Sequence, residues 1–167
     1  MLVGVPGAGK TSVAPHAARL LESPWCDIDV RVVTRARQSI AEIFAAHGED
    51  HFRELERQAM EAALAEAPQV IATGGGWAAE AGNLDALAGR ALVIYLSLAP
   101  AEAARRLAGT SDRPMLVTGA PEERLTELLV ARERWYRLAD IEIAAGDASP
   151  ETVAAGVAVA ARQYGGW

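Results

Sequence analysis

The eight residues from Gly4 to Thr11, GVPGAGKT, limit most strongly what this chain can fold into. They match the pattern G-x-x-x-x-G-K-[ST], follow directly on the apolar residues 1–3, and precede a helical pattern over residues 12–21. In such a turn, successive backbone N–H groups converge on phosphate oxygens, and the N-terminus of the following helix adds its positive dipole. The motif therefore predicts a nucleotide phosphate site between a first strand and a first helix.

The last two positions of the motif carry the chemistry. A lysine there reaches the β- and γ-phosphates, and a threonine hydroxyl binds Mg²⁺. Lys10 is the only lysine of the chain, because the other 15 basic residues are arginines. The lone lysine suits a position where a compact, flexible ammonium is required. The alternative interpretation is an ordinary turn between a strand and a helix.

Short apolar clusters alternate with longer amphipathic stretches along the chain. The clusters are rich in β-branched residues without clean alternation, which is typical of parallel strands covered by helices on both faces. We expect strands at residues 1–5, 25–28, 70–73, 91–96 and 141–144, and helices at 12–21, 40–67, 79–87, 100–107, 121–138 and 150–164. Prolines at positions 100, 121 and 150 suit the first turn of a helix. The pattern predicts an α/β fold of three layers.

Composition excludes several classes of protein. A length of 167 residues, 51% hydrophobic and 23% charged, suits one globular domain over residues 1–167 rather than a disordered chain. The net charge of −6 argues against nucleic acid as the main partner. The longest apolar stretches, residues 91–96 and 153–161, are too short to span a bilayer. With one cysteine, Cys26, and no basic segment after Met1, we expect neither secretion nor a disulfide framework, and a cytoplasmic location. We also expect a monomer.

Two carboxylates close the second predicted strand. Asp27 and Asp29 flank Ile28, and the period of an extended segment would place both side chains on one side of it. One carboxylate could then serve Mg²⁺ and the other a hydroxyl group. The alternative is a solvated strand end.

Further candidates are two arginines and a run of glycines. Arg53 has Glu56 at i+3, which could hold its guanidinium, although such a pair is commonly a surface salt bridge. Three consecutive glycines, 74–76, are costly to order unless something approaches the backbone closely. Arg132 lies on the helix predicted at residues 121–138, and taken alone it is interpreted as a solvated arginine. Residues 109–119, rich in turn residues and flanked by glycines, form a candidate mobile loop.

Together these motifs resemble the shikimate kinases, small members of the nucleoside-monophosphate-kinase-like branch of P-loop proteins. The resemblance covers nearly the whole chain in the family's order: GVPGAGKT, CDIDV, FRELE, TGGG, DRPML, RxxxY and GDASP. It implies a three-layer P-loop NTPase fold with a five-stranded parallel sheet, helices on both faces, an acceptor-binding segment over about 31–66 and a mobile lid over about 109–119. It also implies ATP-dependent phosphorylation of the 3-hydroxyl of shikimate, which gives shikimate 3-phosphate and ADP in aromatic amino acid biosynthesis.

The resemblance assigns roles to residues, with ATP and shikimate as the small-molecule partners and Mg²⁺ as cofactor. The catalytic residues it implies are Lys10, Asp29 and Arg113. Those implied to bind ATP are Gly7, Ala8, Gly9, Lys10, Thr11, Ser12, Arg106, Arg113, Ala148 and Pro150. Those implied to bind shikimate are Asp29, Arg53, Gly74, Gly75, Gly76 and Arg132. Thr11 and Asp27 are implied to hold the metal.

Two alternatives stay open. The first is a P-loop kinase of another small hydroxy acid such as gluconate, against which the arginine pair and the glycine triplet argue. The second is a catalytically silent nucleotide-binding paralogue. The chain has every residue expected of an active site, which argues against the second alternative: Lys10, Thr11, Asp27, Asp29 and Arg113.

Overall fold

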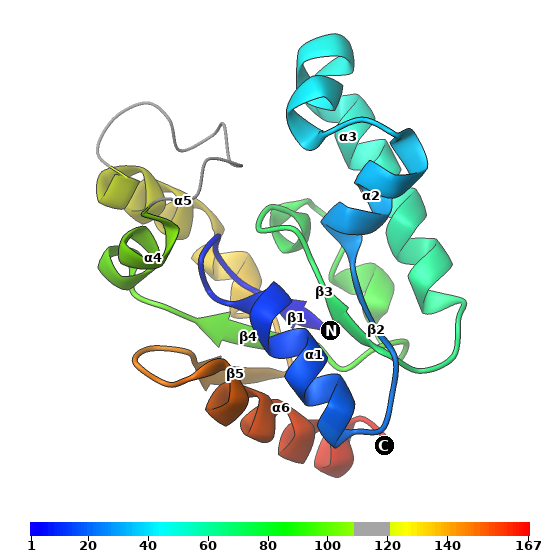
Figure 1. Ribbon diagram of the computed structural model, residues 1–167, viewed down its shortest axis with the longest axis vertical. Helices are drawn as coiled ribbons and strands as arrows, with labels where there is room; N and C mark the ends of the chain where they lie inside the picture. The colour runs from blue at the N-terminus through cyan, green and yellow to red at the C-terminus, as the bar shows by residue number, and fades with distance from the viewer. Residues whose placement is uncertain (109–120) are drawn as a thin grey trace.

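The computed structural model describes residues 1–108 and 121–167, and its core is a sheet of five strands (Figure 1). The strands are β1 (Leu2–Val3), β2 (Trp25–Asp27), β3 (Val70–Ala72), β4 (Ile94–Ser97) and β5 (Ile141–Ala144). All pairings are parallel, in the order β2-β3-β1-β4-β5, and Leu2 of the central strand faces both Ala72 and Ile94. The predicted five-stranded parallel sheet is therefore confirmed. The predicted lid, including Arg113, lies outside the described residues.

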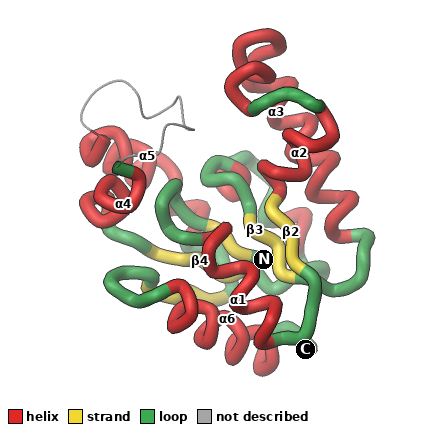
Figure 2. The backbone as a smooth tube through the Cα atoms, in the orientation of Figure 1, coloured by secondary structure: helices red, strands yellow, loops and turns green. Residues whose placement is uncertain are grey.

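Helices pack in pairs around this sheet. They are α1 (Lys10–Leu20), α2 (Ile28–Ala36), α3 (Ile40–Leu64), α4 (Pro100–Leu107), α5 (Pro121–Tyr136) and α6 (Pro150–Tyr164). Helix α1 packs against α6, α2 against α3, and α4 against α5. Figures 1 and 2 show α1 and α6 side by side on one face of the sheet, while α2 and α3 project beyond the edge formed by β2. On α5, Tyr136 stacks on Tyr95 of β4 with ring centroids 5.2 Å apart.

Burial explains why the central strands lack alternation. Both residues of β1 and all three of β3 are buried, whereas the edge strand β5 alternates between half-buried and exposed positions. A strand between two helical layers needs apolar side chains on both faces, and an edge strand needs them on one. No helix in the described part of the chain combines the length and apolarity that a membrane span requires.

The predicted starts of three helices are confirmed, and one predicted helix is absent from the structure. Helices α4, α5 and α6 begin at Pro100, Pro121 and Pro150, as expected. The helix expected at 79–87 is wrong: two short 3₁₀ turns, Trp77–Ala79 (η1) and Asp85–Leu87 (η2), occupy this region. Between them Gly82 has a φ of 83°, which an α-helix cannot contain.

Helix α3 also departs from a single regular helix. It carries a non-helical residue, Gly48, with φ 80° and ψ 179°. Its start is capped reciprocally, because the Ser39 hydroxyl accepts from Glu42 N while the Glu42 carboxylate accepts from Ser39 N. The acceptor-binding segment predicted over about residues 31–66 thus consists of α2 and the two parts of α3.

Candidate active site

The phosphate-binding loop connects β1 to α1 at the carboxyl end of the sheet. Gly4, Gly7 and Gly9 all have positive φ, at 144°, 84° and 89°. A Cβ atom on Gly4 would lie 2.6 Å from the carbonyl oxygen of Leu96, so a side chain is excluded there by space as well as by conformation. Helix α1 then starts at Lys10, which directs its first N–H groups toward the loop. This is the strand–loop–helix arrangement that the motif predicts.

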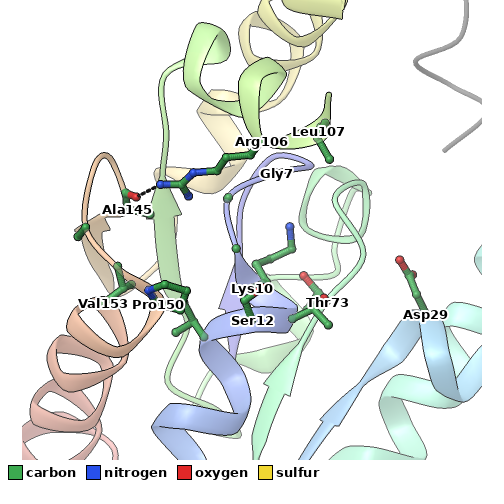
Figure 3. A pocket seen from close by; sticks show the side chains of 15 residues that line it. Gly7, Lys10, Ser12, Asp29, Thr73, Arg106, Leu107, Ala145, Pro150 and Val153 are labelled. Atoms are coloured by element: carbon green, nitrogen blue, oxygen red, sulfur yellow. Dashed lines mark hydrogen bonds between the residues drawn. The ribbon is translucent and has the colours of Figure 1, made fainter. Parts of the chain in front are cut away.

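Lys10 lies over this loop. The side chain is buried, and Nζ donates to the carbonyl oxygens of Gly4 at 2.8 Å and Val5 at 3.1 Å. Figure 3 shows its ammonium pointing into a cavity beside Gly7. The cation is thus held by main-chain oxygens at the place where the loop would receive phosphate.

The cavity around Lys10 has a volume of about 440 Å³. The predicted ATP-binding residues that line it are Gly7, Ala8, Gly9, Lys10, Thr11, Ser12, Arg106, Ala148 and Pro150, while Arg113 lies outside the described residues. Sequence reasoning did not assign to ATP the other lining residues, Val13, Asp29, Thr73, Leu107, Ala145 and Val153. Four of these are ordinary apolar side chains, Asp29 was already predicted to bind the acceptor, and Thr73, directly after β3, carries a positional signal.

Arg106 joins two walls of this cavity. Its Nε donates to Glu102 Oε1 at 2.9 Å on the same helix, and Nη2 donates to the carbonyl oxygens of Ala145, at 2.8 Å, and Gly146. Figure 3 shows the guanidinium reaching from α4 to the turn between β5 and α6. The guanidinium therefore links α4 to the turn after β5 close to the phosphate loop, since a Cβ on Gly9 would lie 3.8 Å from its Nη1.

Thr11 and Asp27 are brought together as predicted for a metal site. Thr11 Oγ1 donates to Asp27 Oδ2 at 2.7 Å. Hydroxyl and carboxylate oxygens suit Mg²⁺, which takes few protein ligands and completes its shell with waters and substrate phosphates. The pair therefore fits a magnesium ion brought by a nucleotide. In the part of the chain that the structure describes, no three histidine, cysteine, aspartate or glutamate side chains gather as a separate metal site.

The expected geometry of the two aspartates is wrong. Strand β2 ends at Asp27, so Asp27 and Asp29 do not lie on one side of an extended segment. Asp27 is the N-cap of α2, where its Oδ1 accepts from Val30 N at 3.3 Å, and Asp29 lies in the first turn of the helix. An aspartate before a helical pattern is a common N-cap, and this signal was present in the sequence.

A second cavity of about 650 Å³ lies between the sheet and the α2–α3 segment. It is lined by every residue predicted to bind the acceptor: Asp29, Arg53, Gly74, Gly75, Gly76 and Arg132. One wall is apolar, formed mainly by Val30, Val33, Ile40, Ala41, Phe44, Phe52 and Leu128. Thr11 and Asp29 line both cavities, so the two cavities meet at these residues.

Each glycine of the triplet makes room for a different neighbour. A Cβ on Gly74 would lie 2.6 Å from Glu56 Oε1 and 2.7 Å from Asp29 Oδ1. A Cβ on Gly75 would lie 2.9 Å from the ring of Pro6 in the phosphate loop. A Cβ on Gly76 would lie 2.7 Å from Nη2 of Arg53. The close approaches expected from three consecutive glycines are therefore present, and all three involve the site.

The expected pairing of Arg53 with Glu56 is present at 2.8 Å. The Glu56 side chain is only 1% exposed. Burial raises the pKa of Glu56 to about 7; the hydrogen bond and charge of Arg53 oppose the shift, and Asp29 and Glu80 add to it. The pair is thus part of the cavity wall rather than a surface salt bridge.

Arg132 and Tyr136 share one acceptor on the glycine triplet. Arg132 Nη1 donates to the carbonyl oxygen of Gly75 at 3.2 Å, and the Tyr136 hydroxyl donates to the same oxygen. Tyr136 is fully buried, so the RxxxY spacing places one side chain in the cavity and one in the core beneath it. Trp77, directly after the triplet, is 3% exposed and packs in the core.

A parallel α/β sheet with a phosphate-binding loop after its central strand, joined to a second cavity at the same edge, defines a P-loop kinase. The family model "Shikimate kinase" matches residues 6–161. The chain belongs to the shikimate kinase family.

Curated relatives and solved structures agree with this assignment. The shikimate kinase of Caldanaerobacter subterraneus subsp. tengcongensis is 40% identical over 92% of this chain and 90% of its own length. That of Mycobacterium tuberculosis is 39% identical over 82% of this chain and 77% of its own. The structure of Acinetobacter baumannii shikimate kinase in complex with shikimate superposes with a TM-score of 0.91 at 31% identity, covering 98% of this chain and 92% of that one.

Proposed function

We propose that this protein transfers the γ-phosphoryl group of MgATP to the 3-hydroxyl of shikimate, giving shikimate 3-phosphate and ADP. One observation carries the proposal: the nucleotide cavity and the acceptor cavity meet at Thr11 and Asp29. Direct phosphoryl transfer needs donor and acceptor within one continuous site. Two separate cavities would suit binding of two ligands but not a reaction between them.

On the donor side, Lys10 and the loop N–H groups would hold the β- and γ-phosphates, and Thr11 with Asp27 would hold Mg²⁺. The metal, when bound, neutralises charge that develops on the transferred group. Arg106 would border the adenine together with Ala148 and Pro150. The family resemblance adds Arg113 as a further cation at the phosphates.

On the acceptor side, Asp29 would orient the attacking hydroxyl and take up its proton. The position supports this role, because Asp29 is the one carboxylate among the described residues that line both cavities. Arg53 and Arg132 would bind the carboxylate of shikimate, since guanidinium groups pair with carboxylates through two parallel hydrogen bonds. The apolar wall would cover the ring. Catalysis would then consist mainly of positioning and charge neutralisation.

The test is a coupled assay of ADP release with shikimate, quinate and gluconate in parallel. We expect turnover with shikimate well above turnover with the other two acids. Equal ADP release with all three acids would refute the acceptor assignment, and the absence of release with any of them would favour a silent nucleotide-binding protein.

A further inference from the structure

Three carboxylates surround the guanidinium of Arg53. Nη1 lies 2.8 Å from Glu56 Oε2, Nη2 lies 2.8 Å from Glu49 Oε1, and Nε lies 3.4 Å from Glu80 Oε1. Glu49 and Glu56 belong to α3 like Arg53 itself, whereas Glu80 follows η1 in the loop after the glycine triplet. The Arg53 side chain is only 13% exposed and Glu56 only 1%, whereas Glu49 and Glu80 are about half exposed, so solvent screens part of the charge of these two.

Glu80 differs from the other two carboxylates in what it contributes. Glu56 and Glu49 both hydrogen-bond the guanidinium and so hold it in place. Glu80 makes no hydrogen bond to Nε, which is buried without a hydrogen-bond partner in the described structure. Its side chain is 46% exposed and is absent from the lining of the acceptor cavity. Glu80 therefore supplies compensating charge from outside the cavity and adds little to the geometry of Arg53.

Arg132, the other guanidinium of the acceptor cavity, has a different environment. Its hydrogen bond goes to the neutral carbonyl of Gly75, and no carboxylate within residues 1–108 and 121–167 forms an ion pair with it. The two arginines thus present unequal charge to an anion. Among the described residues, Arg132 has no carboxylate partner, whereas three carboxylates already compensate the charge of Arg53.

We propose that Glu80 sets the affinity for the acceptor by compensating the charge of Arg53 from outside the cavity. This inference rests on the proposed function, in which the acceptor carries one carboxylate. An acceptor carboxylate that pairs with Arg53 must share a guanidinium whose charge Glu80 already partly compensates, so Glu80 weakens acceptor binding through Arg53. The product keeps this carboxylate and gains a phosphate, so Glu80 weakens product binding at least as much. Glu80 acts through Arg53 and touches no reacting atom.

The test replaces Glu80 by glutamine, which keeps the size of the side chain and removes its charge. Asp85→Asn is the matched control, because Asp85 is an exposed acid of the nearby turn η2 without a described ion pair. For Glu80→Gln we expect the KM for shikimate to fall about three- to fivefold, the upper range for a partly exposed charge pair. Inhibition by shikimate 3-phosphate should strengthen by at least the same factor. The values of kcat and of KM for ATP should stay within about twofold of the unmodified enzyme, as should all parameters of Asp85→Asn.

A double-mutant cycle shows whether the effect passes through Arg53. In an Arg53→Ala background, the gain from Glu80→Gln should shrink to less than about twofold, because the compensated cation is gone. Calorimetric titration of the same variants with shikimate measures the dissociation constant for shikimate in the absence of turnover. A KM and a dissociation constant for shikimate that stay unchanged or rise in Glu80→Gln would overturn the proposal. An unmodified enzyme that binds shikimate without phosphorylating it would instead contradict the proposed function and leave the calorimetric comparison valid.

Discussion

Gly76 leaves the space that the guanidinium of Arg53 occupies: a Cβ atom at position 76 would lie 2.7 Å from Nη2 and 3.0 Å from Nη1. The backbone of Gly76 is in the right-handed region, so alanine is permitted by conformation, and the three atoms nearest to its Cβ would all belong to the Arg53 guanidinium. Because Glu49 and Glu56 hold the guanidinium, it cannot retreat freely. The glycine is thus required by a side chain of the acceptor cavity and not by a turn.

Gly76→Ala should therefore damage acceptor binding more than folding. We expect the KM for shikimate to rise by at least about tenfold, as for the loss of a charge-assisted hydrogen bond, with unfolding free energy changed by less than about 1 kcal/mol. Steady-state kinetics and urea denaturation measure the two quantities. Gly156→Ala, on α6, is the control. The nearest atoms to its Cβ would belong to Ile143 of β5, at ordinary van der Waals distances of 3.6 and 3.8 Å. Normal shikimate affinity in Gly76→Ala would show that Arg53 does not bind the acceptor.

Lys10→Met tests the phosphate loop, since methionine keeps most of the side-chain length and removes the ammonium. We expect kcat to fall by about a thousandfold, the usual loss for one preorganised charged donor, while the protein still unfolds cooperatively. Arg57→Met removes an exposed cation from α3 and should leave kcat unchanged. Turnover near normal in Lys10→Met would mean that phosphate is transferred elsewhere.

Asp29→Asn separates chemistry from nucleotide binding. The amide keeps the size of the carboxylate and cannot take up a proton, so we expect kcat to fall about a hundredfold or more. Affinity for MgATP, measured by calorimetry, should stay close to that of the unmodified protein. Asp50→Asn, at an exposed position of α3, is the matched control. A kcat within a few-fold of normal in Asp29→Asn would exclude Asp29 as the base.

The buried carboxyl of Glu56 should make folding stability depend on pH. Its pKa is raised to about 7 in the folded protein from an ordinary value of 4.5, so the folded state binds the proton more tightly than the unfolded state. The stabilisation from this proton is complete below pH 4.5 and is lost as the pH rises toward 7. Relative to Glu56→Gln, the unfolding free energy should decline by at most about 1.4 kcal/mol per pH unit over this window. Urea denaturation between pH 4.5 and 8 measures the difference, and a constant difference would contradict the shifted pKa.

The sequence was informative wherever chemistry restricts the residue type. A loop that receives phosphate needs glycines and a lysine at fixed spacing, and this spacing also fixes the strand before it and the helix after it. The run 74–76 was informative for the same reason, since Glu56, Pro6 and Arg53 each approach one of its glycines. The residues of these two features line the nucleotide cavity and the acceptor cavity.

Other parts of the fold and of the site could not be predicted from the sequence. Val13, Ala145 and Val153 line the nucleotide cavity as ordinary apolar residues of a helix, a strand end and a second helix. The amphipathic stretch 79–87 predicted a helix, but Gly82 adopts a positive φ that the apolar pattern does not encode. The role of Glu80 depends on a contact between segments 27 residues apart, Arg53 and Glu80, which only the folded chain brings together.

The central claim is transfer of one phosphoryl group from ATP to the 3-hydroxyl of shikimate, and identification of the product tests it most directly. Phosphorus and proton NMR of the reaction with stoichiometric MgATP should show one shikimate 3-phosphate for each ADP formed. Lys10→Met should form neither product at a comparable rate. Inorganic phosphate in place of the ester, or an ester at another hydroxyl, would contradict the account.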